Sequence, residues 1–401
     1  MTRSLPLTSV LATATAFAAL CAGAGTAQAQ FQQTNLVSNI PGLATTTDSG
    51  LVNPWGVSFA LGSPIWISDQ GTNTSPLFAV KGSTGVGNAP LFTVNIPTTA
   101  SGPQGPTGQV ANALGIAGSK SAGFDVNNGG NGAPANFIFA NLNGSISAWN
   151  GMPLTQAFTQ TTVAGASFTG LAINQADTRL FAANDAGSGS VDVFDSKFKA
   201  VDAGGFKTPT AISAAGLVPF NVTDLGGNVF VTYAVSGHIP QTEAMAGQGA
   251  VAEFNENGTL EKTIVGPGGP LASPWGVAIA PSTFGKLGGD ILVGNFSFAK
   301  GVADTIDAFN PVTDALAGTI AVNPGAGNAP GGLWSIVFGA SGSDGTPNTL
   351  FFTDGINGET GGLVGSITAA PEPSTWAMML LGFGGLAFFG ARRRRAAPAI
   401  G

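Results

Sequence analysis

Polar residues with oxygen-bearing side chains recur at one position of a repeated pattern, which suggests a coordinating or hydrogen-bonding site. Each one ends a short run typical of a β-strand, such as Ile65–Asp69 or Leu350–Asp354, and successive members lie 43 to 72 residues apart. A ring of such oxygens could coordinate calcium or accept hydrogen bonds from a sugar. Asp and Asn also begin hairpin turns by bonding their own backbone, so a turn-forming role is the alternative. The six candidates are Asp69, Asn141, Asn184, Tyr233, Asn295 and Asp354.

The loop after the last of these strands offers three weak candidates for a metal site. Asp354, Asn357 and Glu359 place oxygen-bearing side chains in a glycine-rich segment. The segment lacks the full pattern of an EF-hand loop. We therefore predict no resident cofactor, and calcium is the one candidate metal.

The sequence lacks the residues that common catalytic sites need. His238 is the single histidine, which excludes a zinc site built from several histidines. Cys21 is the single cysteine and lies in a segment predicted to be removed, so the mature chain has no thiolate nucleophile. No Gly-x-Ser-x-Gly elbow supplies a serine for His238. We interpret His238 as a loop residue and predict no catalytic residues, which favours a protein that is not an enzyme.

The composition favours strands and turns over helices. The chain of 401 residues contains 61 Gly and 25 Pro, and 9% of its residues are charged, compared with roughly 25% in ordinary soluble domains. Few Lys, Glu and Arg leave little material for long surface helices, whereas Val, Phe, Thr and Gly suit strands joined by tight turns. We therefore expect an all-β fold.

Strand-like runs repeat around each polar position and predict a propeller. The run that ends in the polar residue follows a run such as Asn53–Val57 or Ser273–Val277, and it precedes an alternating run such as Gly189–Phe194. The repeat length suits propeller blades with loop insertions. The sequence therefore predicts a six-bladed β-propeller over residues 30–370, rather than two separate β-sandwiches.

The last blade lacks an outer strand of its own. Pro371 follows its third strand, Leu363–Thr368, almost at once, whereas Gln33–Ser38 precedes the first blade without a partner. Pairing of these two segments would close the ring and leave only short sheet edges. We expect this N-terminal strand to complete the sixth blade.

Two further features of the predicted propeller bear on function. Trp55, Trp275 and Trp334 occupy equivalent places in innermost strands, so we interpret them as packing between blades rather than as sugar-stacking residues. The stretch Pro97–Lys120 has no clear strand pattern, and we expect a long insertion there, either a binding loop or a solvated linker.

The N-terminus has the three parts of a secretory signal peptide. Arg3 supplies the positive charge, Leu5–Leu20 is apolar, and Ala27 and Ala29 form the small-x-small cleavage pattern for a signal peptidase. We predict that residues 1–29 are removed. Cys21 is then a spectator, because Leu20 stands where a lipoprotein signal has a small residue.

The C-terminus combines three signals in a fixed order. Pro371, Glu372 and Pro373 precede an apolar run, Trp376–Ala391, and the basic cluster Arg392, Arg393, Arg394 and Arg395 follows. This order resembles the PEP-CTERM sorting signal of Gram-negative bacteria. The resemblance implies that residues 371–401 are recognised by an exosortase, that the membrane is contacted only through this segment before processing, and that the protein reaches the cell surface or extracellular matrix. A plain membrane anchor with a transmembrane helix is the alternative.

Removal of both ends changes the charge that the folded part carries. The mature chain loses Arg3, Glu372 and the four terminal arginines, which leaves nine basic and twenty acidic residues and a net charge of −11. Nucleic acid is therefore an unsuitable partner, because binding phosphates requires clustered Lys and Arg.

Several motifs also resemble an uncharacterised bacterial family of exported propellers, similar to NHL-type folds. The shared motifs cover nearly the whole mature chain and include Asn53–Gly56, Pro106–Gly108, Gly144–Asn150, Ser273–Pro281 and Gly332–Trp334. The resemblance implies a fold and an export route, and it supplies no activity or catalytic residues.

Together these features predict an exported propeller that binds or scaffolds matrix components such as exopolysaccharide. The alternative is a calcium-dependent hydrolase or lactonase built on a similar propeller, with calcium at the polar ring. That alternative requires several carboxylates at one centre, and the repeat position offers only Asp69 and Asp354.

Overall fold

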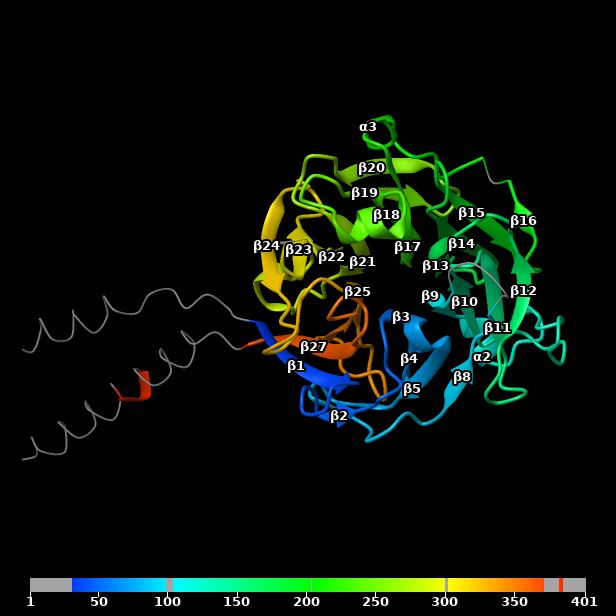
Figure 1. The fold of residues 1–401 in the computed structure, drawn as a ribbon, viewed down its shortest axis with the longest axis horizontal. Coiled ribbons are helices and arrows are strands. Elements are labelled where there is room, and N and C mark those ends of the chain that lie inside the picture. The colour runs from blue at the N-terminus through cyan, green and yellow to red at the C-terminus, as the bar shows by residue number, and fades with distance from the viewer. Residues whose placement is uncertain (1–30, 99–103, 203, 300–301, 371–381, 385–401) are drawn as a thin grey trace, which may run out of the picture. The chain divides into compact units, whose positions relative to one another are not determined.

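A computed structural model describes residues 31–98, 104–202, 204–299, 302–370 and 382–384 of the chain. The chain divides into two compact units, Gln33–Thr368 and a second unit made of the two terminal segments. In the second unit, residues 382–384 form a helical turn. In the first unit, six β-sheets stand around a central axis (Figure 1). The predicted six-bladed β-propeller is therefore confirmed.

In each blade one edge strand of the sheet lies innermost at the axis (Figure 1); the four-stranded sheets of blades 1 to 5 are antiparallel, whereas the outer edge of blade 6 contains a parallel pair. Blades 1 to 3 consist of β3 (Pro54–Ser58), β4 (Ile65–Asp69), β5 (Thr74–Phe78) and β8 (Thr93–Asn95); β9 (Pro106–Ala111), β10 (Phe137–Asn141), β11 (Ser145–Trp149) and β12 (Phe158–Thr162); and β13 (Phe168–Ile173), β14 (Arg179–Asn184), β15 (Ser190–Asp195) and β16 (Ala200–Val201). Blades 4 to 6 consist of β17 (Leu217–Leu225), β18 (Asn228–Val235), β19 (Ala250–Asn255) and β20 (Leu260–Val265); β21 (Ser273–Ile279), β22 (Ile291–Phe296), β23 (Thr305–Phe309) and β24 (Leu316–Ala321); and β25 (Leu333–Phe338), β26 (Leu350–Asp354), β27 (Leu363–Ala369), β1 (Phe31–Ser38) and β2 (Thr46–Thr47).

The N-terminal strand closes the ring, as the sequence predicts. β1 lies between β27 and β2 in blade 6. The Ser38 hydroxyl donates to the Gly362 carbonyl at 2.7 Å. The Gln33 side chain donates to the Asn323 carbonyl at 2.8 Å and accepts from the Asn323 amide at 2.9 Å. These bonds attach the first strand of the domain to segments more than 280 residues away, so closure does not depend on the sheet ladder alone.

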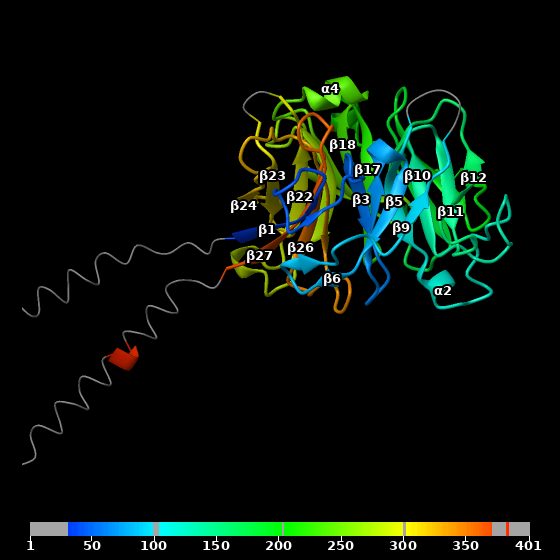
Figure 2. The ribbon, with the colours of Figure 1, turned by 60° about the horizontal axis from the view of Figure 1, so that its bottom comes forward.

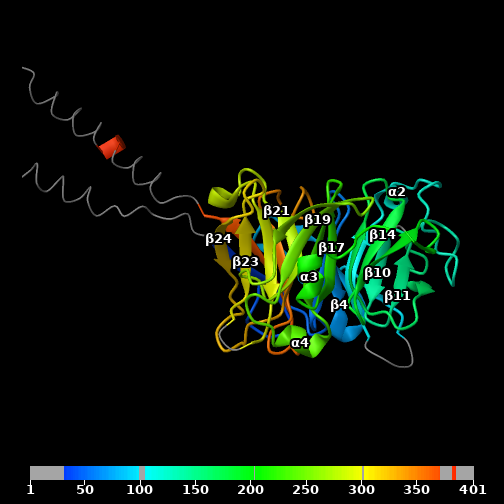
Figure 3. The same ribbon diagram turned by 90° about the horizontal axis from the view of Figure 1, so that it is seen from above.

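Connecting elements mark two opposite faces of the ring. The short helix α4 (His238–Thr242) follows the second strand of blade 4, and α2 (Ala113–Ile116) follows the innermost strand of blade 2. Figures 2 and 3 place α4 and α2 at opposite ends of the axis. We call these ends the α4 face and the α2 face. The remaining short elements are β6 (Val80–Lys81), β7 (Gly85–Val86), α3 (Thr210–Ala214), η1 (Gln70–Thr72) and η2 (Gly285–Leu287).

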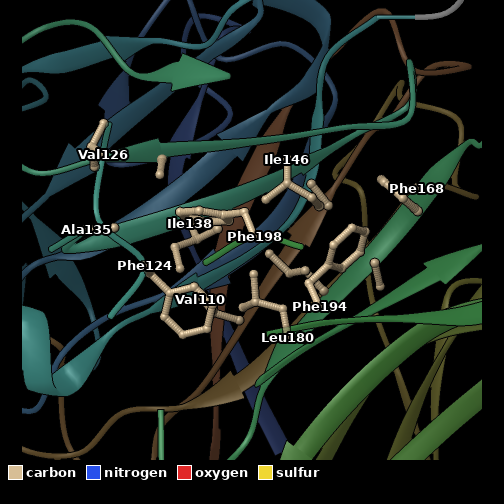
Figure 4. Packing of buried hydrophobic residues seen from close by; sticks show 14 residues of the cluster. Val110, Phe124, Val126, Ala135, Ile138, Ile146, Phe168, Leu180, Phe194 and Phe198 are labelled. Atoms are coloured by element: carbon tan, nitrogen blue, oxygen red, sulfur yellow. The ribbon is translucent and has the colours of Figure 1, made fainter. Parts of the chain in front are cut away.

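The hydrophobic core lies between neighbouring blades. One large cluster joins blades 2 and 3, where Ile138 and Ile146 face Leu180 and Phe194 (Figure 4). The rings of Phe168 and Phe194 meet edge to face, with centroids 5.9 Å apart. Burial of each such side chain stabilises the fold by about 1.5–3 kcal/mol. The stability of the ring therefore comes from contacts between sheets rather than from any single sheet.

The expectation of a strandless insertion over Pro97–Lys120 is wrong for its second half. Pro106–Ala111 forms β9, the innermost strand of blade 2, and Ala113–Ile116 forms α2. The strand escapes detection because it contains Pro, Thr, Gly and Gln. Position 108 requires glycine, because a Cβ at this position would lie 2.2 Å from the Leu171 amide nitrogen of blade 3. Residues 99–103 lie outside the described residues.

Both predicted export segments also lie outside the described residues, apart from 382–384. This applies to the signal peptide of residues 1–29 and to the sorting segment of residues 371–401. In the part of the chain that the structure describes, no helix has the length and apolar character to cross a membrane.

Candidate functional site

The polar residues of the predicted ring lie at or within two residues of the ends of the second strands, next to the α4 face. Asp69, Asn184 and Asn295 use their Oδ1 atoms in the same way: each accepts a hydrogen bond from a backbone amide just before the innermost strand of its own blade. The donors are Val52 at 2.8 Å, Ser167 at 3.1 Å and Ala272 at 2.8 Å. These side chains therefore hold the loop that enters each blade, through bonds to a segment 17 to 23 residues earlier in the chain.

Asn141 and Tyr233 are also directed into their own blades. Asn141 donates to the Ser145 carbonyl at 3.3 Å and to the Ser147 hydroxyl at 3.4 Å, both in β11. Tyr233 is fully buried in the hydrophobic cluster that joins blades 3 and 4. Among the described residues, no hydrogen bond joins two of the six ring members. Their predicted role as a binding ring stays a prediction.

Carboxyl groups near the α4 face have raised pKa values because they are buried. Burial raises the pKa of Asp69 to about 8, although the Thr72 hydroxyl and the Val52 amide oppose the shift. Burial also raises the pKa of Asp304 to about 7. Asp354 is fully buried, and burial together with the nearby charge of Asp304 raises its pKa well above the ordinary range. These carboxyl groups therefore bind their protons more tightly than exposed carboxyl groups do.

Two of the three weak candidates for a calcium loop have separate partners, and the third is buried. The Asn357 carbonyl oxygen Oδ1 accepts from the Ala329 amide at 2.8 Å. Glu359 Oε2 lies 2.7 Å from Nε2 of His238, and Asp354 is buried under the loop. In the part of the chain that the structure describes, no three His, Cys, Asp or Glu side chains are grouped so that they could hold a metal ion.

His238 belongs to a strap that crosses the α4 face, comprising residues 236–248 between β18 and β19. Beyond the bond of His238 to Glu359 in blade 6, Gln241 donates to Asp185 of blade 3 at 3.0 Å and accepts from the Ser273 hydroxyl of blade 5 at 3.0 Å. The strap thus connects four blades. Burial alone would lower the pKa of His238, but the hydrogen bond and charge of Glu359 raise it above the ordinary value. The sequence interpretation of His238 as a loop residue is wrong in detail, because His238 begins the short helix α4. Its bond to Glu359, 121 residues away, has no signal in the sequence.

The three repeated tryptophans meet at the axis beneath this strap. Trp55, Trp275 and Trp334 are buried in one cluster with Phe220 and Phe296. Trp334 lies between Trp55, at a centroid distance of 3.6 Å, and Phe296, at 4.1 Å, with the rings nearly parallel. The prediction that these tryptophans pack in the interior is confirmed, and their partners are one another; Trp275 also lines a channel along the axis. The cluster fills the axis at the α4 face.

Thr107 and Thr169 stand at the corresponding positions of blades 2 and 3. The Thr107 hydroxyl donates to the Phe168 carbonyl at 2.7 Å, and the Thr169 carbonyl accepts from Nε1 of Trp275 at 2.8 Å. The aromatic rings of the cluster therefore come from blades 1, 4, 5 and 6. Blades 2 and 3 contribute the smaller side chains Thr107 and Thr169 at this level of the axis.

A channel of about 410 Å³ continues along the axis from the cluster toward the α2 face, lined by the innermost strands of all six blades. Trp275 lines its inner end and is buried. The lining residues become more exposed along each strand in the direction of the chain. Those near the start of the strands are buried, as at Gly56, Gly108 and Gly276. Those near the end are partly exposed, namely Phe59, Ala111, Ile173 and Phe338, and Ile279 is 42% exposed. The channel is therefore blind, and it opens on the α2 face.

The channel wall is apolar except for a few groups. Among its lining residues in the described structure, Asp224 is the one charged side chain, and it is near the mouth. Asp224 Oδ1 accepts from the Gly227 amide at 2.9 Å and from the Gln175 side chain at 2.8 Å. Burial raises the pKa of Asp224 to about 6, and neighbouring Glu256 adds to the shift. The mouth thus has an acidic edge formed by Asp224 and Glu256.

Comparison with known proteins identifies the C-terminal signal. Residues 369–395 match the family of the PEP-CTERM protein-sorting motif, which includes Pro371–Glu372–Pro373 and the four arginines. The chain is therefore an exported, exosortase-sorted protein with a propeller fold.

The similar full-length proteins have no stated activity. "Uncharacterized protein R648" of Acanthamoeba polyphaga mimivirus is 30% identical over 65% of this chain and 63% of its own length. "Uncharacterized protein L690" of the same virus is 26% identical over 65% of this chain and 67% of its own length. The chain thus spans just under two thirds of the first relative.

A solved structure supports the fold alone. It is a structural genomics protein of unknown function from Bacteroides thetaiotaomicron, with a TM-score of 0.50 and 10% identity, and the match covers 84% of this chain and 76% of that one. The similarity to NHL-type propellers stays a prediction.

Proposed function

We propose that this protein is a non-enzymatic propeller of the cell surface or extracellular matrix that binds a polysaccharide. The observation that carries the proposal is the PEP-CTERM match at residues 369–395, because the exported protein is brought to the place where matrix polymers lie. Transient anchoring in the inner membrane of a Gram-negative cell before exosortase processing is part of the proposal.

The charge of the domain favours a neutral polymer. After removal of both ends, acidic residues outnumber basic residues by eleven. An anionic polysaccharide would be repelled by such a surface, whereas a neutral one is bound by hydrogen bonds and by contacts with its apolar faces. The blind channel on the α2 face offers both kinds of contact.

A calcium-dependent hydrolase or lactonase is the competing proposal from sequence, and the contacts of its key residues count against it. The carboxyls near the α4 face are buried, and among the described residues no three His, Cys, Asp or Glu side chains are grouped so that they could hold a metal ion. His238 is bonded to Glu359 and packs beside Trp55 and Phe296 at centroid distances of 6.5 and 6.3 Å. These groups serve the structure of the α4 face rather than a reacting centre.

A glycan array tests the proposal. We expect the purified full-length chain to bind at least one neutral polysaccharide and to bind acidic polysaccharides more weakly. The heat-denatured chain is the control for non-specific adsorption. If the chain binds no polysaccharide on the array, the proposed function is wrong. A rise in thermal stability on addition of calcium chloride would favour the hydrolase instead.

A further inference from the structure

We propose that the blind channel is the polysaccharide site and that it receives the end of a neutral chain, one or two terminal sugar units, through its mouth on the α2 face. The inference rests on the proposed function and adds the location, the sugar chemistry and the mode of recognition.

The form of the channel determines which part of a polymer can enter. Its volume of about 410 Å³ lies within the range of roughly 300–1,000 Å³ that is usual for small-molecule sites. Trp55, Trp275 and Trp334 close one end, and the lining residues become exposed only toward the other. A continuous polymer cannot thread through a closed tube, so the channel can accept only a chain end.

The wall offers hydrogen-bonding groups as well as apolar ones. Each innermost strand pairs with only one neighbour in its sheet, so its other edge directs backbone N–H and C=O groups toward the axis. Near the closed end some of these carbonyls already have side-chain partners. Gln109 donates to the Gly56 carbonyl at 2.9 Å, and Asn221 donates to the Trp275 carbonyl at 2.8 Å. The remaining edge groups line the channel toward its mouth.

The combination of strand edges and aliphatic side chains suits a sugar better than a lipid. Val57, Leu171 and Ile336 contribute apolar surface to the wall, which can contact the C–H faces of a pyranose ring. Sugar hydroxyls can bond to the strand edges. An alkyl chain would fill the volume but leave these backbone groups without water or any other partner, which is costly.

The closed end supplies an aromatic floor. Trp275 lines the channel, and its Nε1 is bonded to the Thr169 carbonyl at 2.8 Å, so its ring is held in place. A fixed indole provides an apolar surface without the loss of side-chain freedom that a mobile one would suffer on binding. The terminal sugar therefore reaches a rigid ring at the end of the channel.

The acidic edge of the mouth restricts the kind of sugar. Asp224 lines the channel, and Glu256 lies close enough to influence its protonation. Negative charge at a narrow apolar opening disfavours a uronic acid or a sulfated sugar and does not oppose a neutral hexose. Discrimination against acidic chains is thus an expected property of the mouth itself.

Calorimetric titration of the purified full-length chain tests the site. The ligands are three neutral tetrasaccharides, cellotetraose, maltotetraose and mannotetraose, and tetragalacturonate is the acidic control. We expect at least one neutral tetramer to bind, and Ile279→Trp at the mouth to weaken that binding by at least about tenfold. Leu316→Trp is the matched control, because Leu316 is a similarly exposed residue on the outer strand of the same blade. Thermal melting shows whether each variant folds. If Ile279→Trp does not fold, Ala111→Phe replaces it, because this substitution also narrows the channel.

The outcomes separate this inference from the proposed function. If Ile279→Trp and Leu316→Trp bind the tetramer equally well, the channel is not the site, although polysaccharide binding stands. If no tetramer binds but the intact polymer does on the array, recognition of chain ends is wrong and the broader function again stands. If neither binds, both proposals fail. Tighter binding of tetragalacturonate than of every neutral tetramer would overturn the assignment of a neutral sugar.

Discussion

The two ends of the central axis are built from the same repeated strands and have opposite properties. At the α4 face, side chains from four blades form a buried aromatic cluster, and a strap tied to three other blades covers it. At the α2 face, the same strands end in partly exposed apolar residues around an open mouth. The two ends of a sixfold repeat therefore differ when side chains meet and close the axis at one end of the innermost strands and leave it open at the other.

The largest difference between the two ends is expected in stability. Trp334→Ala removes the ring between Trp55 and Phe296, together with its Nε1 hydrogen bond to Asn53. The expected loss is about 3–5 kcal/mol of unfolding free energy, measured by urea denaturation, and Trp275→Ala is expected to fall in the same range. If either variant unfolds at the wild-type urea concentration, the aromatic cluster is not what closes and stabilises this end.

A pH dependence of stability is expected next, and it arises mainly from the closed end. The folded pKa values of Asp69, at about 8, and Asp304, at about 7, lie above the ordinary value of 3.8. The folded state therefore binds these protons more tightly than the unfolded state. Their contribution is fully present below pH 4 and is lost as the pH rises toward 8.

Thermal melting between pH 4 and pH 9 measures this effect, and two Asn variants compare the ends. The wild-type protein loses stability as the pH rises, and each Asn variant should lose less. We expect the larger difference from wild type for Asp69→Asn, because the pKa of Asp69 is raised to about 8 and that of Asp224 only to about 6. A larger change for Asp224→Asn would contradict the assignment of the stronger burial to the α4 face.

The strap is expected to have a smaller effect. His238 is about half exposed, so its pair with Glu359 is worth no more than about 1 kcal/mol after screening by solvent. A double-mutant cycle with His238→Gln and Glu359→Gln measures the coupling energy at pH 6. The partly exposed pair Lys262–Asp314, whose Nζ and Oδ1 atoms are 2.8 Å apart, is the reference for a surface ion pair. A coupling energy of zero between His238 and Glu359 would mean that their contact does not stabilise the α4 face.

The open end is expected to tolerate substitution. Ile279 is 42% exposed, so Ile279→Trp should change the unfolding free energy by less than about 0.5 kcal/mol. Urea denaturation beside Leu316→Trp checks this. A loss comparable to that of Trp334→Ala would show that the mouth is part of the packed core.

Much of the fold could be predicted because it repeats. The strand runs before Asp69, Asn184 and Asp354 identify the blades, and the missing outer strand of blade 6 identifies β1 as its donor. β9 was missed because its Pro, Thr, Gly and Gln residues carry no apolar alternation. Contacts with neighbouring strands stabilise β9 as a strand, and one of them is the close approach of Gly108 to Leu171.

The site was less predictable because it depends on contacts between distant segments. The repeat position of Trp55, Trp275 and Trp334 predicts burial, but only closure of the ring brings the three rings together. His238 and Glu359 have no shared motif, and they meet because the strap crosses from blade 4 to blade 6. The channel itself has no signature in the sequence, since it is formed by the edges of strands whose side chains pack between blades.

The structure of the protein bound to a neutral tetrasaccharide tests the central claim most directly. The account predicts that the terminal sugar lies in the channel against Trp275, with the rest of the chain leaving past Ile279 and Asp224 on the α2 face. A tetrasaccharide bound on the α4 face, or on the outer strands, with an unoccupied channel would contradict it.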